Sequence, residues 1–155
     1  MNIKLLVIGK TNNNNLNDLI NQYSKKLNHY INFEIIILKD PKKCSSKNLQ
    51  KEMEGRLILT KLKANDYIIL LDENGIEYGS VKFSDYLQKK MNSGLKNLYF
   101  IVGGPYGFSK ELIDRSNFKL SLSKMTFSHD MIRLFFLEQL YRAYSILNNE
   151  PYHHR

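Results

Sequence analysis

Residues 99–133 read YFIVGGPYGFSKELIDRSNFKLSLSKMTFSHDMIR, and this stretch decides the fold class. An apolar run at 99–102 ends in a Gly-Gly-Pro turn at 103–105, where the proline prevents further sheet pairing. A second apolar segment, 118–122, leads into a polar elbow at 123–128 and then into a long helix. Two glycines after a strand allow another backbone, or a ligand, to approach closely. We therefore expect a ligand site at this turn.

The rest of the chain alternates between strand-like and helix-like patterns. Apolar and β-branched runs predict strands at 3–9, 33–38, 66–72, 98–102 and 118–122. Apolar side chains at helical spacing predict helices at 16–27, 49–62, 80–94, 109–114 and 128–149, with Ser80 and Ser109 as expected N-caps. This alternation is typical of an α/β domain with a mainly parallel sheet flanked by helices, and a single domain is expected over residues 1–155.

Three strand ends are the expected walls of a binding pocket. In open parallel sheets, ligands bind beyond the carboxyl ends of the strands. The ends at Leu71, Gly103 and Leu122 belong to the third, fourth and fifth predicted strands. The sequence therefore predicts that these three positions converge on one pocket.

Composition favours a cytoplasmic protein with a polyanionic partner. The 23 lysines and arginines outnumber the 15 acidic residues, and nucleic acid would complement the net charge of +8, although ordinary solubility explains it equally well. No apolar run reaches membrane-spanning length and no signal peptide is visible, so no membrane association is expected. The single cysteine, Cys44, excludes an intrachain disulfide and a Cys-rich metal site, and no metal is expected.

The last predicted helix has more apolar surface than one core requires. One stripe comprises Ile132, Phe135, Phe136, Leu140, Ala143, Tyr144 and Leu147, and a second comprises Met131, Leu134, Leu137 and Tyr141. A helix that is apolar on two sides is buried on two sides. Either the monomer encloses this helix or a second subunit covers it, and a homodimer is favoured because a small domain has few layers.

Residues near the C-terminus are the candidates for acid–base and phosphate chemistry. His129 opens the last helix and shares a face with Arg133, although a polar residue that merely starts a helix is a slightly simpler interpretation. The tail 152–155, Tyr-His-His-Arg, combines an aromatic ring, two imidazoles and a guanidinium, which suits stacking on a base and binding phosphate. Arg142 lies four residues after Glu138, where a weak surface ion pair is the simplest interpretation.

Several of these segments together resemble one known family. They are IVGGPYG at 101–107, LSLSKMTFSHDMIRLFFLEQLYRAYSI at 120–146 and PYHHR at 151–155. In this order they resemble the RlmH ribosomal RNA methyltransferases of the SPOUT superfamily. The resemblance covers essentially the whole chain, and its C-terminal third is the specific part.

The resemblance implies a fold, a cofactor and a substrate. The C-terminal part of the sheet would pass through a loop to form a deep trefoil knot, which sequence physics alone would not propose. The enzyme would be a homodimer that uses S-adenosylmethionine to methylate N3 of a pseudouridine in 23S ribosomal RNA on the assembled ribosome. By motif match, the cofactor contacts would be Leu71, Gly103, Leu122, Ser123, Lys124, Met125, Thr126 and Phe127.

The methyl-transfer reaction that the resemblance implies suggests roles for residues on the acceptor side of the site. The N3 proton must leave, so a base or a polarising donor helps, and the imidazoles of His129 and His153 are both candidates. Tyr152 would stack on, or hydrogen-bond to, the target base. The expected substrate contacts are Arg133, Arg142, His154 and Arg155. If the tail crosses to the partner subunit, each active site is composite. The family tail has a basic residue directly after Tyr-His, whereas here His154 intervenes, so the arginine is shifted by one position.

Two other functions fit the residues without the resemblance. One is a non-catalytic RNA-binding or ribosome-associated module of the same fold, which would keep the basic charge and the aromatic residues. The other is an unrelated α/β enzyme that binds a different nucleotide at the glycine turn. Binding of S-adenosylmethionine, alone and in competition with ATP or NAD, distinguishes these alternatives.

Overall fold

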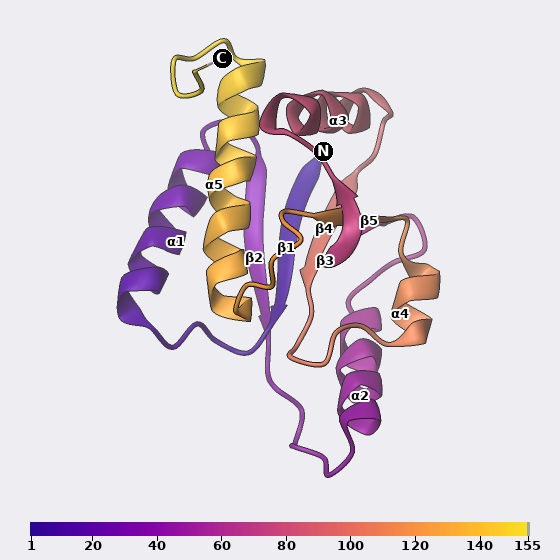
Figure 1. Cartoon of the computed structure of the whole chain (residues 1–155). Coiled ribbons are helices and arrows are strands. Elements are labelled where there is room, and N and C mark those ends of the chain that lie inside the picture. The colour runs from indigo at the N-terminus through magenta and orange to yellow at the C-terminus, as the bar shows by residue number, and fades with distance from the viewer. Residues whose placement is uncertain (155) are drawn as a thin grey trace.

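A five-stranded, all-parallel sheet forms the centre of the computed structural model, which describes residues 1–154 (Figure 1). The strand order is β2-β1-β4-β3-β5. The strands are β1 (Asn2–Ile8), β2 (Asn32–Leu38), β3 (Tyr67–Glu77), β4 (Asn97–Val102) and β5 (Phe118–Ser121). The central strands are continuous apolar runs because both faces of the sheet are covered, as is usual for parallel sheets. The α/β class predicted from the sequence is confirmed.

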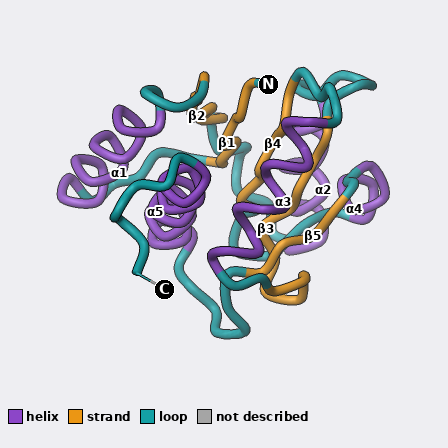
Figure 2. The backbone as a smooth tube through the Cα atoms, turned by 90° about the horizontal axis from the view of Figure 1, so that it is seen from above, coloured by secondary structure: helices purple, strands orange, loops and turns teal. Residues whose placement is uncertain are grey.

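Helices cover both faces of this sheet. They are α1 (Asn14–Leu27), α2 (Lys47–Leu59), α3 (Ser80–Asn92), α4 (Lys110–Arg115) and α5 (His129–Leu147). The larger core cluster joins one sheet face to α1, α3 and α5, with Phe100 and Phe136 fully buried and their rings 4.5 Å apart. The smaller cluster joins the other face to α2 and α4 through Ile58 and Leu112. Figure 2 shows α1 and α5 side by side, as their contacts also indicate.

Two local predictions need correction. The third strand extends to Glu77 rather than ending at 72, because its pairing with β5 resumes after a register shift between Leu71 and Ile76. Gly75 lies within the irregular part, where a Cβ would be 2.7 Å from the Lys119 backbone. Ser80 does not cap α3: Gly79 holds that position without a side-chain hydrogen bond, and the Ser80 hydroxyl donates to Gln139 instead.

Helix α5 lies between α1 and α3, and its burial differs from the predicted stripes. Most of the first stripe is buried, but Phe135 is 39% exposed and its ring packs at a tilt against that of Phe127 in the elbow, with the ring centres 4.9 Å apart. Among residues 1–154, no helix is both long and apolar enough to span a bilayer. The trefoil knot implied by the family resemblance stays a prediction.

Candidate active site

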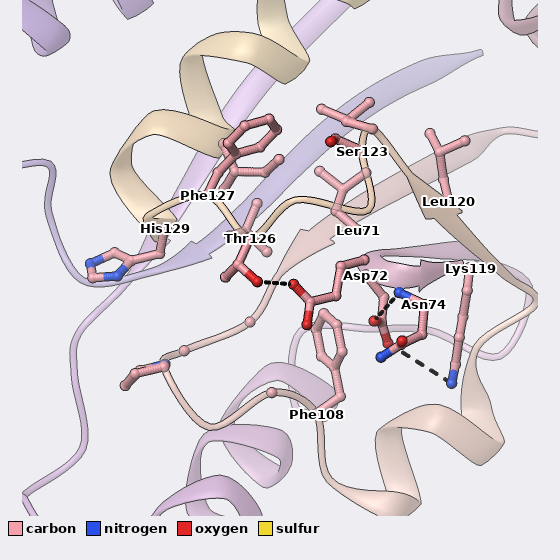
Figure 3. A pocket seen from close by; sticks show the side chains of 18 of the residues that line it. Leu71, Asp72, Asn74, Phe108, Lys119, Leu120, Ser123, Thr126, Phe127 and His129 are labelled. Atoms are coloured by element: carbon pink, nitrogen blue, oxygen red, sulfur yellow. Dashed lines mark hydrogen bonds and ion pairs between the residues drawn. The ribbon is translucent and has the colours of Figure 1, made fainter. Parts of the chain in front are cut away.

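A pocket of about 740 Å³ lies where β4 and β5 end, beside residues 71–74 of β3 (Figure 3). Three segments enclose it: the irregular part of β3 at 71–74, the glycine turn at 103–108, and the elbow that leads into α5. Of the predicted cofactor positions, Leu71, Gly103, Leu122, Ser123, Met125, Thr126 and Phe127 line the pocket. Lys124 is not among the lining residues; it is exposed. The three predicted positions, Leu71, Gly103 and Leu122, therefore line one pocket as expected, although Leu71 lies within β3 and not at its end.

The glycine turn is shaped by contacts within the chain. A Cβ at Gly103 would lie 3.0 Å from the ring of Phe108, and one at Gly104 would lie 2.3 Å from a carboxylate oxygen of Glu54. Gly107 has a φ of +82°, which favours glycine, and its N–H donates to the Gly104 carbonyl at 3.2 Å. The glycine pair thus accommodates side chains of its own protein.

The elbow is held by hydroxyl groups rather than by regular structure. The Ser121 hydroxyl donates to the Ser123 carbonyl at 2.8 Å, and the Ser123 hydroxyl accepts from the Met125 amide at 3.0 Å. The Thr126 hydroxyl donates to Glu73, which connects the elbow to the β3 side of the pocket (Figure 3). These bonds leave the Met125 side chain 75% exposed.

His129 lies at the rim of this pocket, in the first turn of α5 (Figure 3). Ser128 caps the helix by accepting from the Met131 amide at 3.2 Å, which fixes where α5 begins. The His129 ring is half-exposed and its Nε2 is 3.6 Å from an Asp130 carboxylate oxygen. An accessible imidazole beside the pocket can exchange a proton with a bound substrate.

The tail packs against the middle and the C-terminal half of α5, and none of its described residues lines this pocket. The Tyr152 hydroxyl donates to Glu138 at 3.0 Å, and its ring lies 4.7 Å from the Arg142 guanidinium. Arg142 also contacts the His153 ring nitrogen at 3.3 Å and donates to Glu138 at 2.6 Å. Burial, with hydrogen bonds to Tyr23 and Glu138, raises the pKa of Tyr152. Within one chain the predicted site residues therefore form two separate groups.

Comparison with known proteins shows the family of this chain. A family model described as a predicted SPOUT methyltransferase matches residues 1–153. The chain belongs to the SPOUT methyltransferase family. Two full-length relatives, both named ribosomal RNA large subunit methyltransferase H, are 59% identical in Flavobacterium psychrophilum and 57% identical in Christiangramia forsetii, each over 100% of both chains. A relative of the same name from Porphyromonas gingivalis is 49% identical over 99% of both chains. The resemblance to RlmH proteins is confirmed.

Arg133 of this SPOUT protein has a different place from the one predicted. Its side chain is 3% exposed and donates to the Ile8 carbonyl at 2.8 Å, the Gly9 carbonyl at 3.0 Å and the Thr11 hydroxyl at 2.9 Å. Burial lowers the pKa of this guanidinium, while Asp130 and Asp40 act in the opposite direction. The predicted substrate contact is therefore corrected: Arg133 joins the end of β1 to the start of α5.

The remaining tail predictions have simple outcomes. His154 is exposed, and Arg155 lies outside the described residues. The Glu138–Arg142 pair is half-buried rather than a free surface ion pair, because Tyr152 and His153 pack over it.

Sequence reasoning missed two acidic residues near the site. Glu138 accepts hydrogen bonds from both Arg142 and Tyr152, and only its spacing from Arg142 signalled a contact. Glu54 is buried in the middle of α2 beside Gly104, and no local motif marks it.

Proposed function

We propose that this protein is an S-adenosylmethionine-dependent methyltransferase that methylates N3 of a pseudouridine in 23S ribosomal RNA on the assembled ribosome, and that it works as a homodimer. The observation that carries the proposal is the pocket where β4 and β5 end, beside residues 71–74 of β3, enclosed by the glycine turn and the elbow. Family membership and the names of the full-length relatives support the same reaction class and substrate.

The residues around the pocket suit this cofactor. A volume of about 740 Å³ is within the usual range for small-molecule sites. Leu71, Val102 and Leu122 provide an apolar wall for an adenine ring, and the glycine turn brings backbone groups to its edge. The carboxylates of Asp72 and Glu73 also line the pocket and suit ribose hydroxyls and a cationic ligand.

The chemistry requires positioning and one proton transfer. When bound, the cofactor supplies a methyl group on a positively charged sulfur. In that transfer N3 would form the new bond to carbon, the sulfur would keep the electron pair of the broken bond and become neutral, and the N3 proton would pass to a base. We assign His129 as the imidazole nearest to this step, because it lies on the pocket rim. The chain's main contribution is to hold the acceptor in line with the methyl group.

Basic residues beside the pocket support an RNA substrate. The loop between β2 and α2 exposes Lys39, Lys42 and Lys43, and Lys47 opens α2. The Lys47 ammonium lies 5.7 Å from the ring centre of Tyr106, which lines the pocket and is 46% exposed. This group places positive charge and an aromatic face where RNA would enter, and the net charge of +8 acts in the same direction.

The separation of tail and pocket supports a composite site. His129 and Arg142 are 13 residues apart on α5, which corresponds to about 20 Å along a helix axis. Tyr152 and His153 contact Glu138 and Arg142 of their own helix and do not line the 740 Å³ pocket, so we infer that they act on the pocket of a second copy. The exposed Phe135 and Met125 provide apolar surface for such a contact.

The direct test is methyl transfer in vitro and in cells. Purified protein with labelled S-adenosylmethionine should methylate ribosomes from cells that lack this protein, and mass mapping should find the methyl group on one pseudouridine of 23S RNA. Ribosomes from normal cells, which already carry the methyl group, are the control. Absence of any cofactor binding at millimolar concentration would reject the enzyme in favour of an RNA-binding module. Displacement of the cofactor by ATP or NAD would favour a different nucleotide enzyme.

A further inference from the structure

A buried carboxyl group lies directly behind the glycine turn, outside the pocket itself. Glu54 is on α2, on the sheet face opposite to α5, and is 4% exposed. Its Oε1 accepts one long hydrogen bond from the buried Gln50 amide at 3.3 Å. Among residues 1–154, no lysine or arginine forms an ion pair with it. A carboxyl group that is so buried and so little compensated is unfavourable for stability alone.

Glu54 occupies the space that a side chain at position 104 would need. A Cβ at Gly104 would lie 2.3 Å from Oε2 and 2.7 Å from Oε1, and Gly104 lines the pocket on its other side. The next residue, Gly55, lies against Ser109, which directly follows the turn and caps α4, because a Cβ at Gly55 would be 2.1 Å from the Ser109 hydroxyl. Residues 54 and 55 of α2 thus pack directly against the glycine turn and the residue that follows it.

A hydrogen bond from Gln50 fixes the position of Glu54. Gln50, which donates to Glu54, also accepts from the Cys44 amide at 3.0 Å and so connects Glu54 to the β2–α2 loop. Two titratable groups act on the carboxyl group from other elements. Burial raises the pKa of Glu54, and the charge of Asp40 raises it further, whereas His129 lowers it. Glu54 therefore contacts the glycine turn, is connected through Gln50 to the basic β2–α2 loop (residues 39–46), and interacts electrostatically with His129 at the pocket rim.

We infer that Glu54 is a positioning residue of the cofactor site, whose carboxyl group fixes the glycine turn in the shape that receives the cofactor. The inference rests on the proposed function. Glu54 does not line the pocket, so it acts through Gly104 and not on the reacting atoms. Glu54 therefore affects the affinity for the cofactor, whereas kcat at saturating cofactor does not depend on it.

The test compares three substitutions on α2 in the full-length protein. Glu54→Ala removes the group beneath the turn, Glu54→Gln keeps its shape, and Glu52→Ala changes an exposed residue of the same helix. With ribosomes as substrate, we expect Glu54→Ala to raise KM for S-adenosylmethionine by about tenfold or more and to leave kcat within about twofold. Glu54→Gln should restore KM to within about threefold, and Glu52→Ala should match the unaltered protein. Calorimetric Kd values should follow KM.

A fourth substitution, in the glycine turn, covers the case in which Glu54→Ala does not fold. Gly104→Ala places a methyl group against the carboxyl group and should weaken cofactor binding by about the same factor. If both variants fold, the double variant should bind better than the two single effects predict, because the clash is removed.

The inference is overturned if Glu54→Ala and Gly104→Ala bind cofactor normally, or if they lower kcat while KM is unchanged. It is also overturned if Glu54→Gln is as weak a binder as Glu54→Ala. These results are distinct from failure of the proposed function, in which the unaltered protein itself binds no S-adenosylmethionine.

Discussion

Replacement of Arg133 by methionine separates an internal role of this arginine from an RNA-binding role. Methionine keeps the length of the side chain but removes the donors to the Ile8 and Gly9 carbonyls and to the Thr11 hydroxyl. A net hydrogen bond to a charged group contributes about 1.5–3 kcal/mol. The loss of stability is reduced because methionine carries no charge that must be desolvated on folding. It is increased because the Ile8, Gly9 and Thr11 oxygens stay buried without a donor. We expect the free energy of unfolding to fall by about 3–5 kcal/mol, with a Tm lower by roughly 6–20 °C.

The assay is urea unfolding followed by circular dichroism, together with ribosome binding measured well below Tm. Arg133→Lys, which keeps the charge and can satisfy one or two acceptors, should recover about half of the loss. Arg56→Met, at an exposed position of α2, is the matched control and should change stability by less than about 0.5 kcal/mol. If Arg133→Met is as stable as the unaltered protein and instead loses ribosome affinity, the guanidinium faces RNA and the internal role is wrong.

Three further predictions concern the tail, the basic loop and Glu54. Removal of residues 152–155 should leave the fold, the dimer and cofactor binding intact but abolish methylation of ribosomes, as measured by light scattering, calorimetry and methyl transfer. Replacing Lys42, Lys43 and Lys47 with glutamine should weaken RNA binding and lower the slope of log affinity against log salt by about 2, because each lysine that neutralises a phosphate contributes about 0.7–0.9. Burial raises the pKa of Glu54 above its ordinary 4.5, so the folded state holds this proton more tightly than the unfolded state does. The free energy of unfolding that this difference contributes is present at low pH and is lost as pH rises through the folded-state pKa. Urea unfolding should therefore show Glu54→Gln gaining on the unaltered protein as pH increases above 4.5.

Each of these predictions has a control. For the basic loop, glutamine replacements at Lys61 and Lys63, in the exposed connection that enters β3 from its amino end, should leave the salt slope unchanged. A tail-deleted protein that still methylates ribosomes would exclude a composite site. A stability difference between Glu54→Gln and the unaltered protein that is constant from pH 4.5 to 8 would show that this carboxyl group does not titrate differently on folding.

The sequence is sufficient to predict the sheet and the position of the pocket. Parallel strands with both faces buried are continuous apolar runs, so segments such as 98–102 are visible without structural information. The pocket follows because the carboxyl ends of parallel strands meet at one edge, which brings Leu71, Gly103 and Leu122 together. The extension of β3 beyond residue 72 is hidden because Gly75 is also typical of a turn.

Long-range contacts explain the rest of what the sequence conceals. Arg133 looks like a phosphate ligand because its partners, the end of β1 and Thr11, are more than 120 residues away in the chain. Glu54 looks like one of two ordinary acidic residues on α2 until Gly104 is placed against it. In both cases the chemical type of the side chain is clear from the sequence, whereas its surroundings depend on how distant segments pack.

The central claim, that a cofactor pocket of one subunit works with the tail of another, is tested most directly by mixing two inactive variants. One carries Gly103→Val, which forces side-chain atoms toward Phe108 in the turn and should abolish cofactor binding. The other lacks residues 152–155. Each should fail to methylate ribosomes alone, and differently tagged chains confirm that mixed dimers form. Random reassociation makes half of the dimers mixed, each with one complete site, so we predict about a quarter of normal methyl transfer. Mixed dimers that form but show no methyl transfer would contradict the account.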